Sequence, residues 1–323
     1  MSKKYDVITI GSASEDVFIK SELFKIAPCV RIEGQTNICL PYGRKIDLEE
    51  LQFGLGGGAF NTVVGFRRQG LKAAPLLNLG KDLTAEKIKE KLKKEGIPTQ
   101  LIMQDEKNLS GFAIIIRRAR GDRTILVYRG ANNHFIPKKI KWNELKKSRF
   151  FYISSFGSED GVLEKLFAFA GKNGIKIAFN PGLEQRTKKA EKMKGILERT
   201  EILLLNEGEA KEFTGKNTVK EAAKRLNELG VRVVAVTRGS EKVIVYAGEK
   251  FYERKPFPIK AKDTTGAGDA FGSGFTSAYI KGMHVRKCIE FGLASAWSVI
   301  NEIGTTQGLP TPKQSERIIK KNK

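Results

Sequence analysis

Short runs of apolar and β-branched residues recur along the chain and alternate with stretches of helical periodicity. The first run, YDVITIG at residues 5–11, ends at a glycine, as a buried strand that leads into a turn does. The other predicted strands are at 74–79, 150–154, 175–180, 202–205 and 231–237, and the predicted helices are at 59–69, 84–95, 160–173 and 218–229. This alternation predicts parallel βαβ units, and therefore a doubly wound sheet with helices on both faces.

Two stretches interrupt the alternation, at about 16–51 and 111–129. The second is typical of a β-hairpin, because β-rich halves flank the turn sequence ARGD. Strands from the two stretches can pair as a small sheet that projects from the main body and excludes water from a cleft. We therefore expect a single α/β domain over residues 1–323, with a small β-sheet lid formed by these two stretches.

The composition indicates a folded chain with a strongly basic surface. Of the 323 residues, 40% are hydrophobic and 29% are charged, which are ordinary values for a globular protein. The net charge is +22, but the lysines of segments such as 86–96 and 138–147 are mixed with glutamate and apolar positions. This pattern is typical of exposed helix faces and does not favour a nucleic-acid partner, whereas the positive field suits a phosphate-bearing ligand.

The cysteines and the apolar runs indicate a protein of the cytoplasm. Three cysteines, at 29, 39 and 288, form no CxxC pair, and their odd number argues against a disulfide framework or a structural zinc site. The apolar stretch near the N-terminus is too short for a signal sequence, and no stretch approaches the length of a membrane span. We expect a cytoplasmic enzyme or binding protein with no membrane partner.

A glycine-rich motif, DTTGAGDAFGSGF at 263–275, predicts an anion-binding turn. Gly266 and Gly268 permit a tight backbone turn, and the residues after them can begin a helix whose first N–H groups are unpaired. Asp269 lies in this first turn, where the helix dipole stabilises an ionised carboxylate by about 0.3–1 kcal/mol and keeps it ready to accept a proton. The alternative is a structural helix start whose glycines allow close packing.

A second glycine cluster, GLGGGAFN at 54–61, admits several interpretations. Gly54, Gly56 and Ala59 match the GxGxxG/A fingerprint of a nicotinamide-dependent oxidoreductase, but the charged segment before them is not the buried strand that this site requires. A sharp bend at these glycines instead exposes backbone amides to a polyhydroxyl ligand, to which Asn61 adds a donor and an acceptor. A tight strand-to-helix turn without a ligand is the plainer alternative.

The chain lacks the motifs of several other nucleotide and metal sites. No GxxxxGK[ST] sequence occurs, so a P-loop is excluded, and HExxH and paired metal-ligand spacings are absent. Only two histidines, His134 and His284, are present, so few candidates exist for a histidine-based mechanism.

Polar motifs follow two predicted strands, at the edge where open α/β sheets bind ligands. NEGE at 206–209 follows the strand ILLL, and TRG at 237–239 follows VRVVAV. Asn206 can reach a phosphate oxygen, and Glu209 can reach a water-bound magnesium ion. We expect these motifs to converge with the 263–275 motif on one rim of the sheet.

The order of these motifs closely resembles that of the ribokinase-like (PfkB) family of carbohydrate and nucleoside kinases, over nearly the whole chain. The matching segments are GSASEDVF (11–18), GGGAFN (56–61), YRGAN (128–132), NPG (180–182), NEGE (206–209), TRG (237–239) and DTTGAGDAF (263–271). The last motif, preceded by NEGE, is highly specific. The resemblance implies a three-layer α/β/α fold with a β lid, and a homodimer that forms through the lid.

The resemblance also implies roles for the matching residues. In this family the GAGD aspartate, here Asp269, is the catalytic base, and the anion hole is formed by the amides of Gly266, Ala267 and Gly268. The residues that match positions holding the acceptor's hydroxyls are Asp16, Gly57, Gly58 and Asn61. The residues on the ATP side are Asn206, Thr237 and Gly239, with Glu209 linked to magnesium. A monovalent-cation site is matched by Asp263 and Thr265, which implies activation by potassium.

The chain departs from ribokinases at positions that bear on the substrates. Ribokinases read GGKGAN where this chain has GGGAFN at 56–61, and a glutamate that follows a strand in ribokinases is replaced in the region of Ser154 and Ser155. Ribose is therefore not favoured as the acceptor. After TRGS, a family glycine is replaced around Glu241 and Lys242, which implies an altered adenine pocket.

We therefore predict an ATP-dependent kinase that transfers the γ-phosphoryl group to a hydroxymethyl group of a sugar or sugar phosphate. A nucleoside acceptor is the first alternative, with Phe60 stacked on the base or packed against the lid. Arg117 or Arg129 would bind the phosphate of a sugar phosphate, or lie solvated on the lid. An alternative of another class is a basic nucleic-acid-binding protein, whose affinity for DNA would fall steeply with salt.

Overall fold

The computed structural model describes residues 3–28, 36–117, 123–155, 157, 161–259 and 262–322. Within these ranges the main sheet has eight strands in the order β16-β15-β14-β13-β12-β11-β1-β6. They are β1 (Tyr5–Ile10), β6 (Ala73–Leu76), β11 (Ser148–Ile153), β12 (Lys176–Phe179), β13 (Ile202–Asn206), β14 (Val233–Thr237), β15 (Val243–Ala247) and β16 (Lys250–Arg254). The pairs from β6 to β14 are parallel, and β15 and β16 continue the sheet antiparallel at one edge.

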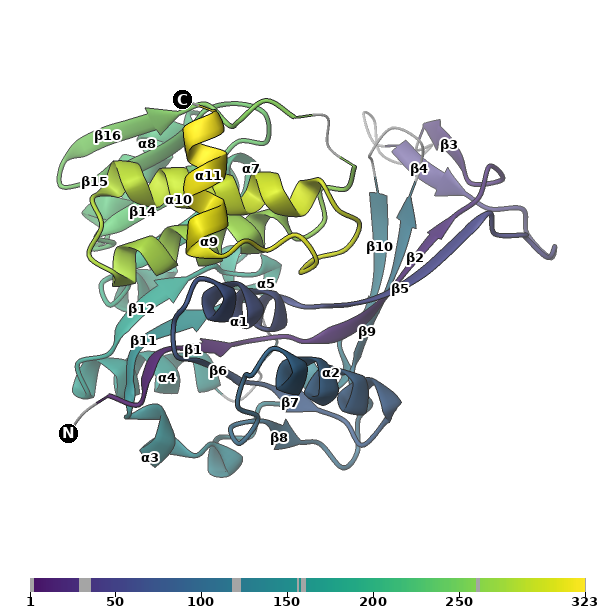
Figure 1. Cartoon of the computed structure of the whole chain (residues 1–323), viewed down its shortest axis with the longest axis horizontal. Coiled ribbons are helices and arrows are strands. Elements are labelled where there is room, and N and C mark those ends of the chain that lie inside the picture. The colour runs from purple at the N-terminus through teal and green to yellow at the C-terminus, as the bar shows by residue number, and fades with distance from the viewer. Residues whose placement is uncertain are drawn as a thin grey trace.

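Helices cover both faces of this sheet (Figure 1), and a large cluster of buried side chains fills each interface. The layer that packs against Ile8 and Ile10 contains α4 (Val162–Lys172), α7 (Glu207–Thr214) and α8 (Val219–Glu228). The layer against Val7 contains α1 (Gly58–Arg68), α2 (Leu83–Lys94), α9 (Ala267–Ile280), α10 (Val285–Ile300) and α11 (Pro312–Lys321). Successive strand residues point to opposite faces, so the apolar run of β1 serves both cores. The predicted doubly wound, three-layer α/β/α fold is confirmed.

Short elements complete the connections of the main body. They are α3 (Trp142–Leu145), α5 (Leu183–Arg186), α6 (Lys194–Leu197) and the parallel pair β7 (Asn78–Leu79) and β8 (Met103–Gln104). Within the described ranges, no helix combines the length and apolar character needed to cross a membrane.

The start and the buried face of α8 illustrate how local sequence defines a helix. The Thr218 side chain accepts a hydrogen bond from the Glu221 N–H, and the Glu221 carboxylate accepts one from the Thr218 N–H. This reciprocal capping box pairs two N–H groups that the helix leaves free at its start. Ala222 and Leu226 follow at helical spacing and are both buried.

A second, smaller sheet projects from one side of the main body (Figure 1). In the described residues it has four strands in the order β10-β9-β2-β5, namely β2 (Ser14–Lys20), β5 (Glu50–Gly56), β9 (Gly111–Arg117) and β10 (Arg123–Tyr128). β2 and β9 are parallel, and the other two pairs are antiparallel. A further pair, β3 (Lys25–Pro28) and β4 (Thr36–Cys39), lies beyond the end of this sheet (Figure 1). The predicted ARGD turn lies outside the described residues.

The small sheet joins the main body at the carboxyl end of β1. The chain passes from β1 into β2 within three residues, and β5 leads directly into α1. β5 is thus a partly exposed strand of the small sheet and not a buried strand of the main sheet. The match of Gly54, Gly56 and Ala59 to a dinucleotide fingerprint therefore lacks its structural context.

Candidate active site

Helix α9 begins at a glycine with a left-handed backbone. Gly266, the N-cap residue, has a φ of 80°, and a Cβ there would lie 3.0 Å from the Cα of Thr305. Both restrictions favour glycine at this position. Ala267 begins the helix of 14 residues and Asp269 occupies its third position, as predicted. The backbone N–H groups of 266–268 therefore lie at the positive end of a helix dipole, where an anion is stabilised.

The carboxylate of Asp269 is half-buried and lines a cavity of about 280 Å³ beside this turn. Asn61 Nδ2 donates a hydrogen bond of 2.8 Å to Asp269 Oδ2. Burial raises the pKa of Asp269 to about 6, the hydrogen bond from Asn61 acts to lower it, and the charge of Asp16 raises it further. A carboxylate with this pKa is mostly ionised at pH 7 and can accept a proton from a hydroxyl group.

A second buried carboxylate, Asp16, lies on β2 near the glycine bend. Ser14 Oγ donates a hydrogen bond of 2.7 Å to Asp16 Oδ1, and burial nevertheless raises the pKa of Asp16 to about 6. A Cβ at Gly56 would lie 1.9 Å from Asp16 Oδ2, so β5 can pass this carboxylate only with glycine there. A Cβ at Gly58 would lie 3.6 Å from Asp269 Oδ1. The bend therefore lies between the two carboxylates.

The glycine bend places Asn61 opposite Asp269. Gly57 is the N-cap of α1 with a φ of 95°, and a Cβ there would lie 2.6 Å from the backbone between β1 and β2. Asn61 follows in the first turn of α1 and donates to Asp269. Its Oδ1 is buried and has no hydrogen-bond partner among the described residues, so it can accept from a ligand hydroxyl. The structure thus gathers near Asp269 the residues predicted to hold the acceptor, namely Asp16, Gly57, Gly58 and Asn61.

Small hydroxyl side chains occupy the region where ribokinases carry a glutamate. A Cβ at Gly58 would lie 2.8 Å from Ser154 Oγ, so Ser154 packs directly against the bend. Ser155 lies further along, where a Cβ at Gly182 would lie 2.0 Å from its Oγ. The predicted departure from ribokinases therefore falls beside residues that were predicted to hold the acceptor.

A larger cavity of about 480 Å³ adjoins the one at Asp269, and the two share Thr237, Thr264, Gly268 and Phe271. Its walls are mainly apolar and include Phe257, Leu293, Trp297 and Ile300. Thr237 and Gly239, which were predicted on the nucleotide side, both line it. An apolar slot that opens onto a helix N-terminus is suited to a molecule with a flat ring at one end and phosphates at the other.

Asn206 and Glu209 line the cavity that contains Asp269, and a capping box joins them. Asn206 Oδ1 accepts from the Glu209 N–H, and Glu209 Oε2 accepts from the Asn206 N–H, both at 2.9 Å. Glu209 Oε1 also lies 3.2 Å from Arg186 Nη1. Among the described residues, no group of three or more His, Cys, Asp or Glu side chains is arranged to hold a metal ion. Glu209 therefore fits a water-mediated contact to a phosphate-bound magnesium ion better than a protein-built metal site.

Asp263 and Thr265 lie in the segment before α9 and line neither cavity. Asp263 Oδ1 accepts hydrogen bonds from the Thr265 N–H at 2.9 Å and from its hydroxyl at 2.7 Å. Asp263 Oδ2 is buried and has no hydrogen-bond partner within the described ranges. A buried carboxylate oxygen in this situation fits a cation ligand.

Arg123 was missed by the sequence analysis. Its Nη1 donates a hydrogen bond of 2.6 Å to Thr264 Oγ1, and it lines the same cavity as Asp269. Strand pairing places Arg123 opposite Arg117, but it is Arg123, the first residue of the edge strand β10, that contacts Thr264 in the segment before α9. The contact joins residues 141 positions apart, and no local pattern in the sequence could indicate it.

The two arginines considered as phosphate ligands line neither cavity. Arg117 Nη2 bonds to Glu50 Oε2 at 3.2 Å, and its guanidinium lies over the ring of Phe18. Arg129 is exposed on the surface, in agreement with the alternative of a solvated residue. Phe60 is fully buried in the core, so the hypothesis that it stacks on a base is wrong.

A family model described as pfkB family carbohydrate kinase matches residues 22–312. The chain belongs to this family. An uncharacterized sugar kinase of Archaeoglobus fulgidus is 31% identical over 252 residues, which are 76% of this chain and 98% of that protein. A ribokinase of Haemophilus influenzae is 28% identical over 289 residues, which are 86% of this chain and 92% of that protein. The predicted family is confirmed, and the protein is a phosphotransferase with an alcohol group as acceptor.

Solved structures of a ribokinase and a nucleoside kinase superpose on nearly the whole chain. Arabidopsis thaliana ribokinase, complexed with ribose and ATP, has a TM-score of 0.81 at 21% identity and covers 99% of both chains. The nucleoside kinase of Methanocaldococcus jannaschii has a TM-score of 0.78 at 23% identity and covers 99% of this chain and 100% of that one. At these identities the likeness establishes the fold.

The two carboxylates predict a steep acid limb in the pH profile of the kinase. Since both Asp16 and Asp269 have pKa values of about 6, kcat/KM should fall below pH 6 with a slope that approaches two decades per pH unit. In D16N one titrating group is gone, so the slope should approach one decade per unit. The midpoint should also move down, because the charge of Asp16 raises the pKa of Asp269. Rates measured from pH 5 to 9 test this, and a flat profile down to pH 5 contradicts it.

Proposed function

We propose that this PfkB family kinase transfers the γ-phosphoryl group of ATP to a hydroxymethyl group of a sugar or sugar phosphate. The hydrogen bond from Asn61 to Asp269, at the first turn of α9, is the observation that carries the proposal. It holds a base beside a helix N-terminus, so that the attacking hydroxyl and the phosphate it attacks can be bound next to each other. Relatives named sugar kinase and ribokinase support a sugar acceptor.

In the proposed reaction, Asp269 accepts the hydroxyl proton while the acceptor oxygen bonds to the γ-phosphorus. The bond from this phosphorus to the β,γ-bridging oxygen breaks, and ADP leaves with the electron pair. The developing negative charge is stabilised by the backbone N–H groups of Gly266, Ala267 and Gly268. The other hydroxyls of the acceptor are bound by Asp16, Gly57, Gly58 and Asn61. The small sheet above the site limits access of water.

The apolar cavity is the proposed nucleotide site. Its apolar walls suit an adenine ring, and its shared boundary with the Asp269 cavity directs the phosphates to the start of α9. Asn206, Thr237 and Gly239 bind the nucleotide on this side. Magnesium would be held by the phosphates, with Glu209 as its protein partner, and would neutralise charge on them.

Asp263 and Thr265 are the proposed ligands of a potassium ion. The unpaired buried oxygen of Asp263 supports this, because a cation there would satisfy it. The ion would neutralise this buried carboxylate and would not take part in the chemical step.

A nucleoside acceptor is the second candidate. The strand register places Asp16, Ala113 and Val127 on one face of the small sheet, with Ile125 two residues before Val127. Ile125 and Val127 are 42% and 58% exposed, so they are available to contact a base. A cytidine kinase of Thermococcus kodakarensis is 36% identical over 165 residues, which are 50% of this chain and 58% of that protein.

We also propose a cytoplasmic location, with no nucleic-acid partner. Cys39 and Cys288 are free thiols, and burial raises the pKa of Cys288 to about 12. Two unpaired cysteines among the described residues suit a reducing compartment. The acidic side chains at the centre of the site disfavour a nucleic-acid backbone as its ligand.

A coupled assay of ADP release with sugars, sugar phosphates and nucleosides identifies the acceptor class, and D269N tests the base. We expect kcat of D269N to fall by at least about two orders of magnitude, with little change in the KM values. Near-normal kcat would remove Asp269 from this role.

The same variant should be more stable than the wild type at pH 7. The raised pKa of Asp269 means that its contribution to stability is present below the unfolded value of about 4 and is lost as the pH rises through 6. Replacing the carboxylate with an amide should therefore raise Tm by about 2–4 °C for each kcal/mol gained in the free energy of unfolding. The Tm values are measured by calorimetry. This separates loss of chemistry from loss of folding.

Arg123 should contribute to transfer through its charge in the cavity that contains Asp269. We expect R123M to lower kcat about ten- to a hundredfold, because a cation near the transferred phosphoryl group is removed. R129M, which removes an exposed arginine outside both cavities, is the matched control and should stay within about twofold of the wild type. Equal effects of the two substitutions would contradict the assignment.

The outer face of the small sheet is the proposed dimer interface. Leu51, Phe53, Leu126 and Tyr128 alternate with the residues on the face that carries Asp16, and each is between 49% and 66% exposed. An exposed apolar patch of this kind is typical of a protein–protein contact. A second copy of the chain is the proposed occupant.

The dimer is tested by light scattering after size-exclusion chromatography. Wild-type protein should elute with the mass of a dimer, and F53K should elute as a monomer, because a buried unpaired ammonium opposes association. L83K, at an exposed leucine on α2 in the main body, is the control and should remain dimeric. A monomeric wild type would refute the interface.

A further inference from the structure

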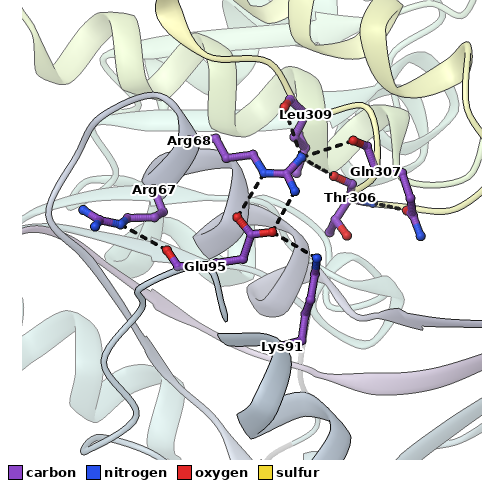
Figure 2. A network of polar contacts seen from close by, with 7 residues as sticks. All are labelled: Arg67, Arg68, Lys91, Glu95, Thr306, Gln307 and Leu309. Carbon is purple, nitrogen blue, oxygen red and sulfur yellow. Dashed lines mark hydrogen bonds and ion pairs between the residues drawn. The ribbon is translucent and has the colours of Figure 1, made fainter. Parts of the chain in front are cut away.

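Arg68, in the last turn of α1, is bound by a carboxylate on one side and by backbone carbonyls on the other (Figure 2). Its Nε and Nη2 donate to the two carboxylate oxygens of Glu95, at 3.1 and 2.7 Å. Its Nη1 donates at 2.8, 3.2 and 3.2 Å to the carbonyl oxygens of Thr306, Gln307 and Leu309. The guanidinium therefore fastens the segment 304–309 to α1.

Glu95 keeps the guanidinium in this orientation. The hydrogen bonds from Arg68 hold the pKa of Glu95 below its usual range against the effect of burial, so the pair remains ionised. Lys91 Nζ also lies 3.0 Å from Glu95 Oε1. The side chains of Arg68 and Glu95 are only 23% and 14% exposed, which shields the bidentate pair from salt.

The fastened segment packs behind the turn that begins α9. Thr305 lies against Gly266, where a Cβ would be 3.0 Å from the Thr305 Cα. Thr305 Oγ1 also donates to the carbonyl oxygen of Leu55, near the end of β5, at 2.7 Å. A Cβ at Gly308 would lie 2.2 Å from the Ser298 carbonyl, so the segment is tightly packed on α10 as well. Its path therefore sets the space behind the N–H groups of 266–268.

One helix thus reaches both parts of the proposed catalytic arrangement. Asn61, at the start of α1, donates to Asp269, and Arg68, near the end, binds the segment behind Gly266. Between them, Gly65 allows α1 to approach α9, because a Cβ there would lie 2.3 Å from Ser273 Oγ. The positions of the proposed base and of the anion-binding turn therefore both depend on α1.

We propose that Arg68 is a positioning residue for phosphoryl transfer, which holds the segment 304–309 against the turn 264–268 and so keeps the N–H groups of that turn aligned with Asp269. Arg68 does not line the cavity that contains Asp269, so it acts through the backbone. A guanidinium suits this role, because its planar fork binds both carboxylate oxygens while a further nitrogen reaches three carbonyls, which one ammonium group cannot do. The expected change in kcat rests on the proposed function, whereas the expected loss of order in the turn 264–268 does not.

The kinetic test compares R68M and R68K with R67M as matched control. Arg67 is the neighbouring arginine, and within the described ranges its side chain bonds only to the Glu95 backbone carbonyl. We expect kcat of R68M to fall at least about tenfold with the acceptor KM within about twofold, since the acceptor-binding residues at the start of α1 keep their places. R68K should recover kcat only in part, and R67M should stay within about twofold of the wild type.

E95Q weakens the orientation of Arg68 without removing it, and should lower kcat in the same direction by a smaller factor. It tests the proposal if R68M fails to fold. The proposal is overturned by a kcat of R68M within about twofold of the wild type, by an equal loss in R67M, or by full recovery in R68K.

Amide hydrogen exchange, followed by mass spectrometry, provides a readout that needs no acceptor. In R68M, exchange in peptides over 262–270 and 304–310 should be at least about fivefold faster, with peptides from β12 and β13 unchanged. R67M should exchange as the wild type does. Failure of the wild type to phosphorylate any acceptor would defeat the proposed function and leave this test standing. Unchanged exchange in R68M would overturn the positioning role whatever the kinetics.

Discussion

Two carboxylates, Asp16 and Asp269, lie on either side of one glycine bend, and the rest of the site is arranged around them. Burial raises the pKa of each to about 6, and the charge of Asp16 adds to the effect on Asp269. Their ionised forms therefore destabilise the folded chain at neutral pH. The two apolar layers on the main sheet must offset this, as is usual where ionisable groups are desolvated.

The site can form because glycines, which have no side chain, occupy the positions where segments pack closely at the junction of the two sheets. Gly56 lets β5 pass Asp16, and Gly57 turns the chain against the connection between β1 and β2. Gly266 makes the corresponding turn at the start of α9, against Thr305. A side chain at any of these positions would push the segments apart, so the glycines allow these segments to pack closely around the two carboxylates.

The two sheets divide the work of the site between them. The main body supplies Asp269, the turn that begins α9 and the apolar cavity, whereas the small sheet supplies Asp16 and Arg123. α1 links the parts, since its first turn contacts Asp269 and its last turn fastens the segment behind Gly266. A substrate that bridges these elements would contact the small sheet at one end and the main body at the other. A rigid main body can therefore keep one chemistry while the contacts to the acceptor vary.

Local sequence by itself determined the alternation of strands and helices, the glycine turns and the position of Asp269 in the first turn of α9, because each depends on residues only a few positions apart. It also indicated that the motifs after β13 and β14 meet at one rim, since parallel strands end at the same edge. Only the tertiary structure decided that Phe60 is core, that Arg123 and not Arg117 or Arg129 lines the cavity that contains Asp269, and that Arg68 binds carbonyls as far as 241 positions away. Those contacts depend on how distant segments fold onto one another, and the periodicity of residues along the chain does not indicate which distant segments will meet.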